Sequence, residues 1–485
     1  MNRKMLAAAV MAFVMMLSAG ACAQEQQKTT FTGDTTEEPE YQMNLNAISP
    51  SAYGDVEGLD LEPGTYISII GKMEGTSYWD AVKKGVMQAA ADLNEKLGYT
   101  GSDKIRVTYN GPAREEDIDE QVNILDEELS RYPDVIGIAS IDEAACTVQF
   151  DLATENGIPI IALDSGNQYQ GIQCTVKTDN QDAARTGAYK LADEMDKKGD
   201  VVVLSHDSKS ETARERVESF QAEIEENYPD IHVAEVIYCD MLDDIKKEMA
   251  EEENKGLREG ERKIEKESFS DTDAVQYVME KYPDLRGMFG TNDSATRLAL
   301  ESIRQTEQAG AEEEQEKNGG ADKRENVDVD KSAEPETKKS SAESAEPEKE
   351  ESDDRSAEPE AKKNNAESAE SEKEERDDRA AEPETDENSD GDRDAEAGYF
   401  NESSTEPFRI ALVGFDTEKE LLKALESGEV AGLVVQNPFG MGYASVVAAA
   451  RTVSEAGNEA QVSTSYLWLT KDNMNDESVQ KMLYE

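Results

Sequence analysis

The chain has 485 residues, of which 33% are charged, and its formal net charge at pH 7 is -58. Nucleic acids and anionic lipid surfaces are held by clusters of Lys and Arg, so a chain this acidic excludes a nucleic-acid-binding function and docking onto a lipid surface through charge. The excess acidity is typical of a highly soluble protein.

Residues 1–21 have the features of an export signal. Arg3 and Lys4 precede an apolar run of about 13 residues, which is too short to span a bilayer as a mature helix. Cys22 follows the small residues of "LSAGAC" and resembles the cysteine of a bacterial lipobox, although Ala19 stands where leucine is usual. We predict lipidation of Cys22 and attachment to the outer face of the bacterial cytoplasmic membrane. Ordinary cleavage, which would leave a free periplasmic protein, is the alternative.

Two segments are predicted to lack fixed structure. Residues 22–64 are polar and rich in turn formers, which indicates a flexible tether. Residues 309–405 form an acidic insertion that contains a direct repeat, residues 332–355 and 356–379, with almost no core-forming side chains. Such a segment cannot bury enough apolar surface to offset its ordering entropy, so we expect a disordered insertion that leaves ligand binding intact.

From Thr65 onward, short apolar runs alternate with amphipathic stretches, which predicts βα units and parallel sheets. A first series of strands is expected at residues 66–71, 104–110, 135–140 and 158–164, with helices at 77–97, 115–132 and 144–157. A second series is expected at residues 172–180, 200–206, 232–240, 285–293, 408–416 and 431–437. The fold class is therefore α/β, with two doubly wound lobes.

Several predicted strands end in a polar residue: Asp164, His206, Asp240, Asn292, Asp416 and Gln436. Ligands of doubly wound sheets bind outside the carboxyl ends of the strands, so we expect these side chains to converge on one crevice. For His206, a satisfied structural role is the alternative. Two lobes with polar strand ends predict a clamshell.

Six motifs in order resemble one family. They are "SYWDAVKKG", "GIPIIALDSG" with "VKTDN", "TARERVESF", "KYPDLRGMFGTNDSATRLAL", "IALVGFD" and "VVQNPFGMGYASVVAA". Together they resemble the type I solute-binding proteins of sugar ABC transporters, the ribose- and galactose-binding group whose fold is shared with the lac repressor effector domain. The resemblance implies two lobes joined by a multi-strand hinge. Lobe 1 would comprise residues 65–178 and 437–463, and lobe 2 residues 179–308, 406–436 and 464–485.

The resemblance also implies the ligand-binding residues. Tyr78 and Trp79 match two aromatics that sandwich a sugar ring, and Asp164 matches a carboxylate that accepts from sugar hydroxyls. Arg216 matches the hydroxyl-binding arginine of the second lobe. The polar strand ends Asn292, Asp416 and Gln436 complete the predicted cleft. The alternatives are core packing for the two aromatics, a turn role for Asp164, and helix capping for Asn292 and Asp416.

Some positions depart from the family pattern. Lys72 and Glu74 follow the first strand where many members carry Asn or Asp, and Ser165 replaces an arginine. Leu242 lies where an aromatic of the second lobe is expected. These departures argue against ribose itself as the ligand.

We expect no catalytic residues, no cofactor and no metal site. The chain has two histidines and lacks the spacing of the common zinc, phosphate and thiol-redox motifs. Asp390, Asp392 and Asp394 resemble only the start of a calcium loop. Free thiols are the default for the cysteines, with a Cys146–Cys174 disulfide as the alternative.

The predicted function is that of a monomeric receptor outside the cytoplasmic membrane. It would bind a sugar or polyol between its lobes and deliver it to the permease subunits of an ABC transporter. A ligand-sensing receptor for a chemoreceptor or sensor kinase uses the same fold and remains the alternative. An adhesin that presents the acidic repeats is a third hypothesis, whereas a transcriptional regulator would need a DNA-binding segment where the export signal stands.

Overall fold

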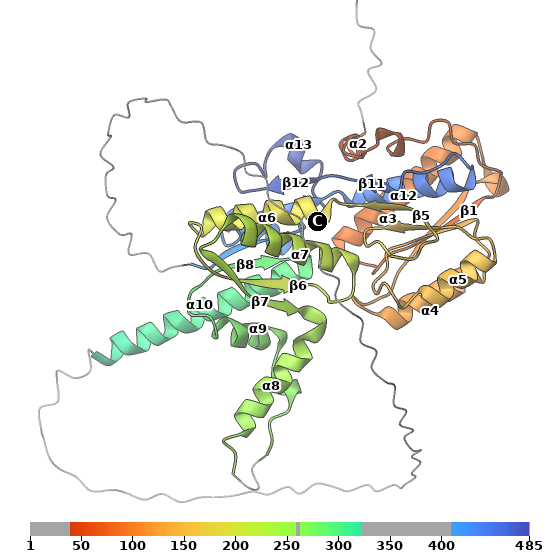
Figure 1. Ribbon diagram of the computed structural model, residues 1–485. Coiled ribbons are helices and arrows are strands. Elements are labelled where there is room, and N and C mark those ends of the chain that lie inside the picture. The colour runs from red at the N-terminus through yellow and green to blue at the C-terminus, as the bar shows by residue number, and fades with distance from the viewer. Residues whose placement is uncertain (1–38, 259–261, 322–408, 485) are drawn as a thin grey trace, which may run out of the picture. The chain divides into compact units, whose positions relative to one another are not determined.

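Two six-stranded sheets, each flanked by helices, form the core of the protein (Figure 1). The computed structural model describes residues 39–258, 262–321 and 409–484. All of these residues except 317–321 belong to one compact unit. The predicted signal peptide, Cys22, the two repeats and the aspartates of the calcium-like stretch lie outside the described residues.

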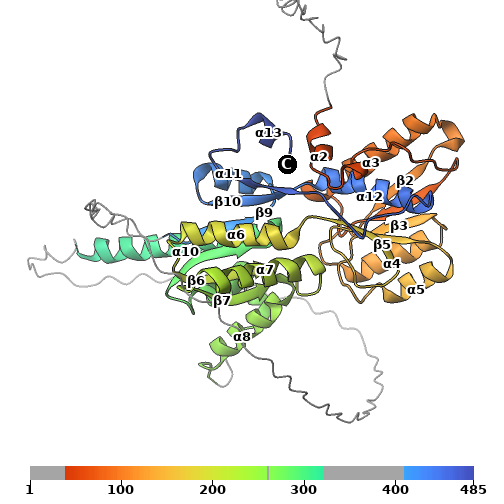
Figure 2. The same ribbon diagram turned by 45° about the horizontal axis from the view of Figure 1, so that its top comes forward.

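The first lobe is built on a sheet with the strand order β11-β5-β4-β3-β1-β2 in which all neighbours are parallel. Its strands are β1 (Tyr66–Ile70), β2 (Arg106–Asn110), β3 (Val135–Ile138), β4 (Ile160–Leu163), β5 (Ile172–Lys177) and β11 (Gln461–Ser463). Its helices are α3 (Ser77–Leu97), α4 (Ile118–Leu129), α5 (Thr147–Glu155) and α12 (Pro438–Val453), with the short η2 (Gly101–Asp103). Although they are far apart in sequence, α3 and α12 lie side by side in both views (Figures 1 and 2).

The second lobe has the strand order β12-β10-β9-β8-β6-β7, in which only the β10–β12 pair is antiparallel. Its strands are β6 (Gly199–Ser205), β7 (Ile231–Tyr238), β8 (Leu285–Gly290), β9 (Ala411–Phe415), β10 (Gly432–Gln436) and β12 (Tyr466–Leu469). Its helices are α6 (Asn180–Glu194), α7 (Glu211–Asn227), α8 (Leu242–Asn254), α9 (Asp271–Met279), α10 (Asp293–Ala321), α11 (Lys419–Ser427) and α13 (Glu477–Gln480), with η3 (Cys239–Met241) and η4 (Lys266–Ser268).

The α/β fold class and its predicted strands are confirmed. Strands such as β1, β3 and β4 are buried along their whole length because helices cover both faces of each sheet, and this explains their uninterrupted apolar runs. Strand β5 opens the second series along the chain but pairs with β4 in the first sheet. Strands β11 and β12 were not predicted, because they are only three and four residues long.

The chain crosses between the lobes three times, after β5, after β10 and after β11. The crossing segments are hydrogen-bonded to one another. The amide N–H of Thr464 donates to the carbonyl of Lys177 (3.1 Å), and the Asn437 side chain donates to the carbonyl of Thr464 (3.1 Å). Three adjacent crossings allow the lobes to hinge while they keep a defined axis.

The predicted tether over residues 22–64 is too long, because residues 39–64 pack on the first lobe. This segment forms α2 (Gln42–Asn46) and η1 (Ser51–Tyr53), and Ser49 pairs with Ser463 of β11. Its buried apolar side chains are Leu45, Ile48, Tyr53, Val56, Leu59 and Leu61. They are spaced irregularly between turn residues, so no helical or strand period revealed their burial.

A protein that begins at residue 65 is expected to be less stable than one that begins at residue 39. Each buried apolar side chain contributes about 1.5–3 kcal/mol, and only part of the sum is offset by ordering the segment. We therefore expect a loss of at least about 3 kcal/mol in the free energy of unfolding. Denaturant unfolding of both proteins measures it, and equal midpoints would show that the segment does not stabilise the first lobe.

Helix α10 continues through Ala321, into the segment over 309–405 for which the sequence predicts no fixed structure. Residues 311–317, "AEEEQEK", are all good helix formers, whereas the last turn contains Gly319 and Gly320. The rest of that segment up to residue 405 lies outside the described residues.

The three described cysteines are free. Cys146 and Cys174 are buried in different core clusters, and burial raises the pKa of each thiol to about 12. Of the helices within residues 39–258, 262–321 and 409–484, none has the length and apolar character needed to cross a bilayer.

Candidate ligand-binding site

A cavity of about 140 Å³ lies between the two lobes, at the carboxyl ends of both sheets. This volume has room for about ten water molecules, which is the size class of a monosaccharide. All the residues predicted from sequence to bind the ligand line this cavity: Tyr78, Trp79, Asp164, Arg216, Asn292, Asp416 and Gln436. The fold thus brings together residues that are widely separated in sequence, and their role in binding stays a prediction.

The aromatic wall of the cavity comes from the start of α3. The side chain of Thr76 accepts a hydrogen bond from the amide of Trp79 and so caps the helix. Tyr78 and Trp79 follow this cap and meet edge to face, with ring centroids 5.1 Å apart. Both are more than 90% buried, so the packing role and the cavity-lining role apply to the same side chains.

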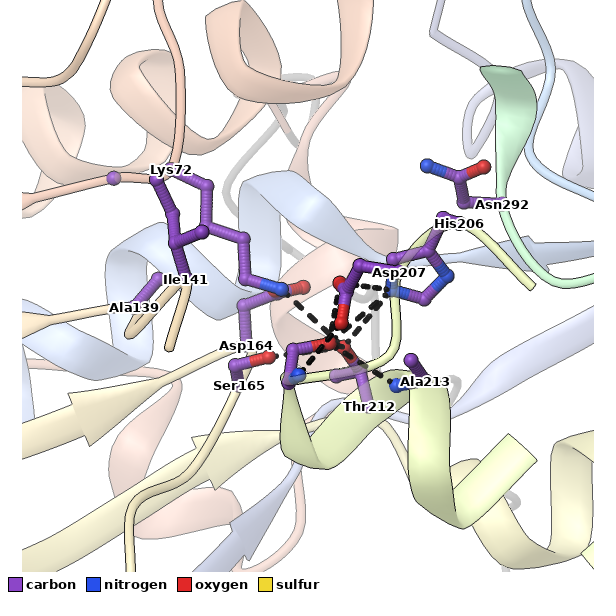
Figure 3. Close-up of polar contacts among 12 residues, drawn as sticks. Lys72, Ala139, Ile141, Asp164, Ser165, His206, Asp207, Thr212, Ala213 and Asn292 are labelled. Atoms are coloured by element: carbon purple, nitrogen blue, oxygen red, sulfur yellow. Dashed lines mark hydrogen bonds and ion pairs between the residues drawn. The ribbon is translucent and has the colours of Figure 1, made fainter. Parts of the chain in front are cut away.

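Asp164 follows β4, and its carboxylate contacts two side chains of the first lobe. The Tyr78 hydroxyl donates to its Oδ1 (2.6 Å). The Lys72 ammonium lies 3.8 Å from Asp164 Oδ2, and Figure 3 shows these two residues near Thr212. The backbone of Asp164 has a φ of 57°, a left-handed conformation that an aspartate tolerates better than most residues. Lys72, noted in the sequence only as a departure, is therefore the counter-ion of a predicted binding residue.

The two lobes also meet at Thr212, near the first turn of α7. Its hydroxyl is bonded to Lys72 Nζ (3.3 Å) and Ser165 Oγ (2.9 Å) of the first lobe, and contacts His206 Nε2 (3.3 Å) of the second (Figure 3). His206 lines the cavity, and its Nδ1 bonds Thr291 Oγ1 (2.8 Å). Burial lowers the pKa of His206, so its imidazole is neutral at pH 7.

Arg216 is 2% exposed and is held by three acceptors. Its Nε donates to Asn180 Oδ1 (2.9 Å), one terminal nitrogen donates to the carbonyl of Thr291 (2.6 Å), and the other donates to Gln436 Oε1 (2.8 Å). The guanidinium also lies over the Phe415 ring, 4.2 Å from its centroid. Each terminal nitrogen keeps one further N–H for a ligand, so the side chain is a preorganised pair of donors.

Asp416 follows β9 and has a φ of 72°. Its Oδ1 accepts from Gln436 Nε2 (2.9 Å) and from the hydroxyl of Tyr484 near the C-terminus (2.5 Å). Arg216, Gln436 and Asp416 therefore form one hydrogen-bonded chain. The predicted alternative, capping of the next helix by Asp416, is wrong, because α11 begins after Glu418 and has no side-chain cap.

Asn292 has its predicted capping role and also lines the cavity, while its role in ligand binding stays a prediction. Its Oδ1 accepts from the amide of Ala295 (2.8 Å) in the first turn of α10, while its Nδ2 faces Glu115 of the first lobe (3.3 Å). Ser294 also donates to this Glu115 (2.9 Å), and Arg214 of the second lobe pairs with Glu143 of the first (2.6 Å). These contacts join the two lobes.

Sequence reasoning missed several charged residues of the cavity wall, namely Glu115, Glu116, Asp293 and Arg297. Glu116 lies in a loop with a φ of 60°, and burial together with the nearby Asp207 raises its pKa to about 8. Burial and the neighbouring Asp416 raise the pKa of Asp293 well above its usual range. Asp293 directly follows the predicted strand-end residue Asn292, and this position could have indicated that it lies at the cavity. No pattern in the sequence pointed to the loop residues.

Within the described part of the chain, no cluster of His, Cys, Asp and Glu has a geometry that could hold a metal ion. The acidic side chains of the cavity are spread around its wall and are held by the tyrosines, amides and cations described above. The arrangement presents fixed hydrogen-bond acceptors, one arginine fork and two aromatic rings, which suits a small polar molecule with an apolar face.

The family described as "Periplasmic binding protein domain" matches residues 67–313. Similar solved structures include a carbohydrate transporter solute-binding protein from Agrobacterium radiobacter in complex with D-arabinose, with 19% identity over 86% of this chain and 98% of that chain and a TM-score of 0.53. Two solute-binding proteins from Agrobacterium vitis are also similar. One, bound to α-D-tagatopyranose, has 17% identity over 87% and 99% of the two chains and a TM-score of 0.55. The other, with D-fucose, has 17% identity over 86% and 100% and a TM-score of 0.54.

No curated protein matches the chain. The family match covers about half of the sequence, and the fold shared with the solved structures extends over most of it, including both sheets. The chain therefore belongs to the periplasmic binding protein domain family.

Proposed function

We propose that the protein is the substrate-binding component of an ABC transporter, which binds a sugar or sugar-like polyol between its lobes and delivers it to the membrane permease. The observation that carries this proposal is the closed cavity between two hinged lobes, with the Tyr78–Trp79 wall on one side and the Arg216 fork on the other. The similar solved structures have D-arabinose, tagatopyranose and D-fucose bound, which supports a monosaccharide for this cavity.

Membership of a family of periplasmic binding proteins supports a site of action outside the cytoplasmic membrane. Within this proposal the protein is a monomer, Cys22 is lipidated and the residues up to 38 lead from the membrane to the first lobe. Mass spectrometry of the mature N-terminus tests the anchor. An acylated Cys22 is expected, and an unmodified N-terminus generated by ordinary cleavage would contradict it.

A sensory receptor that presents its closed form to a chemoreceptor or sensor kinase is the second candidate. The contacts that favour it are those that favour transport. The pairs Glu115–Ser294 and Arg214–Glu143 hold the lobes together, and a partner that binds both lobes would distinguish this closed form from an open one. Neighbouring genes for permease and ATPase subunits would support transport, and a neighbouring kinase gene would support sensing.

Thermal unfolding of the protein from residue 39 onward, against pentoses, hexoses, polyols and small disaccharides, tests the binding function. A ligand present at 100 times its dissociation constant adds about 2.7 kcal/mol to the free energy of unfolding, so a specific rise in the midpoint is expected. If no sugar shifts the midpoint of protein that is shown to be folded and empty, the sugar-receptor proposal is wrong, and the adhesin hypothesis gains support.

A further inference from the structure

The cavity wall has more carboxyl groups than cations. Its carboxyl groups are Glu115, Glu116, Asp164, Asp293 and Asp416, and its cations are Lys72, Arg216 and Arg297. Glu116, whose pKa is raised to about 8, is mostly protonated at pH 7, so the other four carboxyl groups, when ionised, face three cations, and the neutral His206 adds no charge. Neutral sugars need hydrogen-bond acceptors but do not compensate an excess of charge.

No cation of the wall forms an ion pair with Asp416, although the charge of Arg216 opposes the rise that burial causes in the pKa of Asp416. Lys72 lies against Asp164 of the first lobe, and Arg297 is nearer to Glu418 (2.9 Å), outside the cavity, than to Asp293 (4.0 Å). The nitrogens of Arg216 are directed at the amide and carbonyl oxygens described above rather than at a carboxylate. Asp293 therefore shares one cation with Glu418.

Asp416 has no cationic partner at all within 4.0 Å among the described residues. It is 2% exposed, and both groups that donate to its Oδ1, the Gln436 amide and the Tyr484 hydroxyl, are uncharged. No described residue donates to its Oδ2, although the side chain lines the cavity. This oxygen is therefore open to the cavity, where a donor group of the ligand can reach it.

Asp293 and Asp416 lie next to each other in the fold. They follow β8 and β9, which are adjacent parallel strands of the second sheet. Burial raises the pKa of both carboxyl groups, and Asp416 further raises that of Asp293. Two neighbouring carboxyls that repel each other are stabilised in their ionised form by a cation placed between them.

We propose, resting on the sugar-receptor function above, that the ligand is a sugar bearing a basic nitrogen and that Asp293 and Asp416 receive its ammonium group. The sugar ring then lies against the Tyr78–Trp79 wall, and the Arg216 fork binds ring or hydroxyl oxygens. The ammonium donates to Asp416 Oδ2 and to the Asp293 carboxylate, so the ligand brings the positive charge that the wall lacks.

Matched trios of sugars test this proposal: glucose, glucosamine and N-acetylglucosamine, and the same three forms of galactose and mannose. Acetylation keeps the nitrogen and removes its charge. By isothermal titration calorimetry at pH 7, the amine of at least one trio is expected to bind at least tenfold more tightly than both neutral forms. If the amine binds no more tightly than the neutral sugar of its trio, the proposal is overturned while the sugar-receptor function stands. If no sugar or amine binds, both fail.

Two isosteric variants test which carboxyl groups bind the ammonium group of the ligand. Asp416→Asn and Asp293→Asn are each expected to weaken binding of the amine at least tenfold more than they weaken binding of the neutral sugar. Asp240→Asn removes a strand-end carboxylate that does not line the cavity, and serves as the matched control with unchanged affinities. Unchanged amine affinity in both cavity variants would overturn the assignment, and the wild-type comparison of each trio stands even if one variant fails to fold.

Discussion

Replacing Arg216 with lysine is expected to weaken ligand binding about 100-fold, which corresponds to about 2.7 kcal/mol. Lysine keeps the charge but loses the planar fork, so it cannot bond Asn180, Thr291 and Gln436 together and still donate to a ligand. The loss extends beyond one side chain, because Gln436 is held by Arg216 and in turn donates to Asp416. Calorimetric titration with the ligand identified from the sugar panel measures the effect.

The sequence supplies a matched control for this variant in the same "RER" motif. Arg214 is one half-turn away on α7, pairs with Glu143 of the first lobe, and is 39% exposed in its side chain. Exposed ion pairs contribute little, so Arg214→Lys is expected to change affinity less than about threefold. Denaturant unfolding without ligand separates lost binding from lost folding. Equal affinities of the two variants would show that Arg216 has no special role in the cleft.

The sequence predicted the fold class because local pattern and tertiary environment agree along most of this chain. Strands such as "YISII" are apolar throughout, and both faces of the sheet are covered, so the pattern and the burial have the same cause. Strand β11 could not be predicted in this way, because "QVS" is too short to show any period and the strand depends on its pairing with β5. The packed segment over residues 39–64 was missed because its buried apolar side chains are spaced irregularly between turn residues.

The strand-end rule located the cavity but not all of its chemistry. Asp164, Asn292, Asp416 and Gln436 follow strands that the pattern could delimit, so their convergence could be anticipated from the parallel topology. Glu116 and Tyr484 lie in irregular segments, where the position of a side chain depends on single backbone angles or on the path of the chain end. The hydrophobic periodicity of the sequence does not indicate where such side chains lie.

Hydrogen-bond partners were the least predictable part of the site. Lys72 was visible in the sequence as a departure from the family pattern, but its pairing with Asp164 depends on the geometry of two strand ends. Likewise, helix capping and a position in the cleft were predicted as alternatives for Asn292, but they are compatible, because different atoms of one side chain can make the two contacts. The structure shows the amide oxygen and the amide nitrogen in different roles.

The two variants with the largest expected effect on stability are Gly85→Ala and Gly442→Ala, at the contact between α3 and α12. A Cβ atom at Gly85 would overlap the carbonyl oxygen of Phe439, and one at Gly442 would overlap the carbonyl oxygen of Val82. Backbone atoms of two packed helices cannot move aside as a side chain can. Each substitution is therefore expected to cost about 3 kcal/mol in the free energy of unfolding, at the upper end for overpacked sites. Denaturant unfolding measures this cost.

Gly310→Ala is the matched control, because Gly310 also lies within a helix, α10, and an added Cβ there meets nothing within 4 Å. It is expected to raise the free energy of unfolding by up to about 1 kcal/mol, since alanine is the better helix former.

The contact between α3 and α12 at Gly85 and Gly442 also affects ligand binding. Helix α3 starts with the aromatic wall and α12 begins just after Gln436, so forcing these helices apart shifts Tyr78 relative to Gln436. Ligand affinity should then fall together with stability in Gly85→Ala and Gly442→Ala. Full affinity in a destabilised variant would show that the cavity is positioned by the sheets alone.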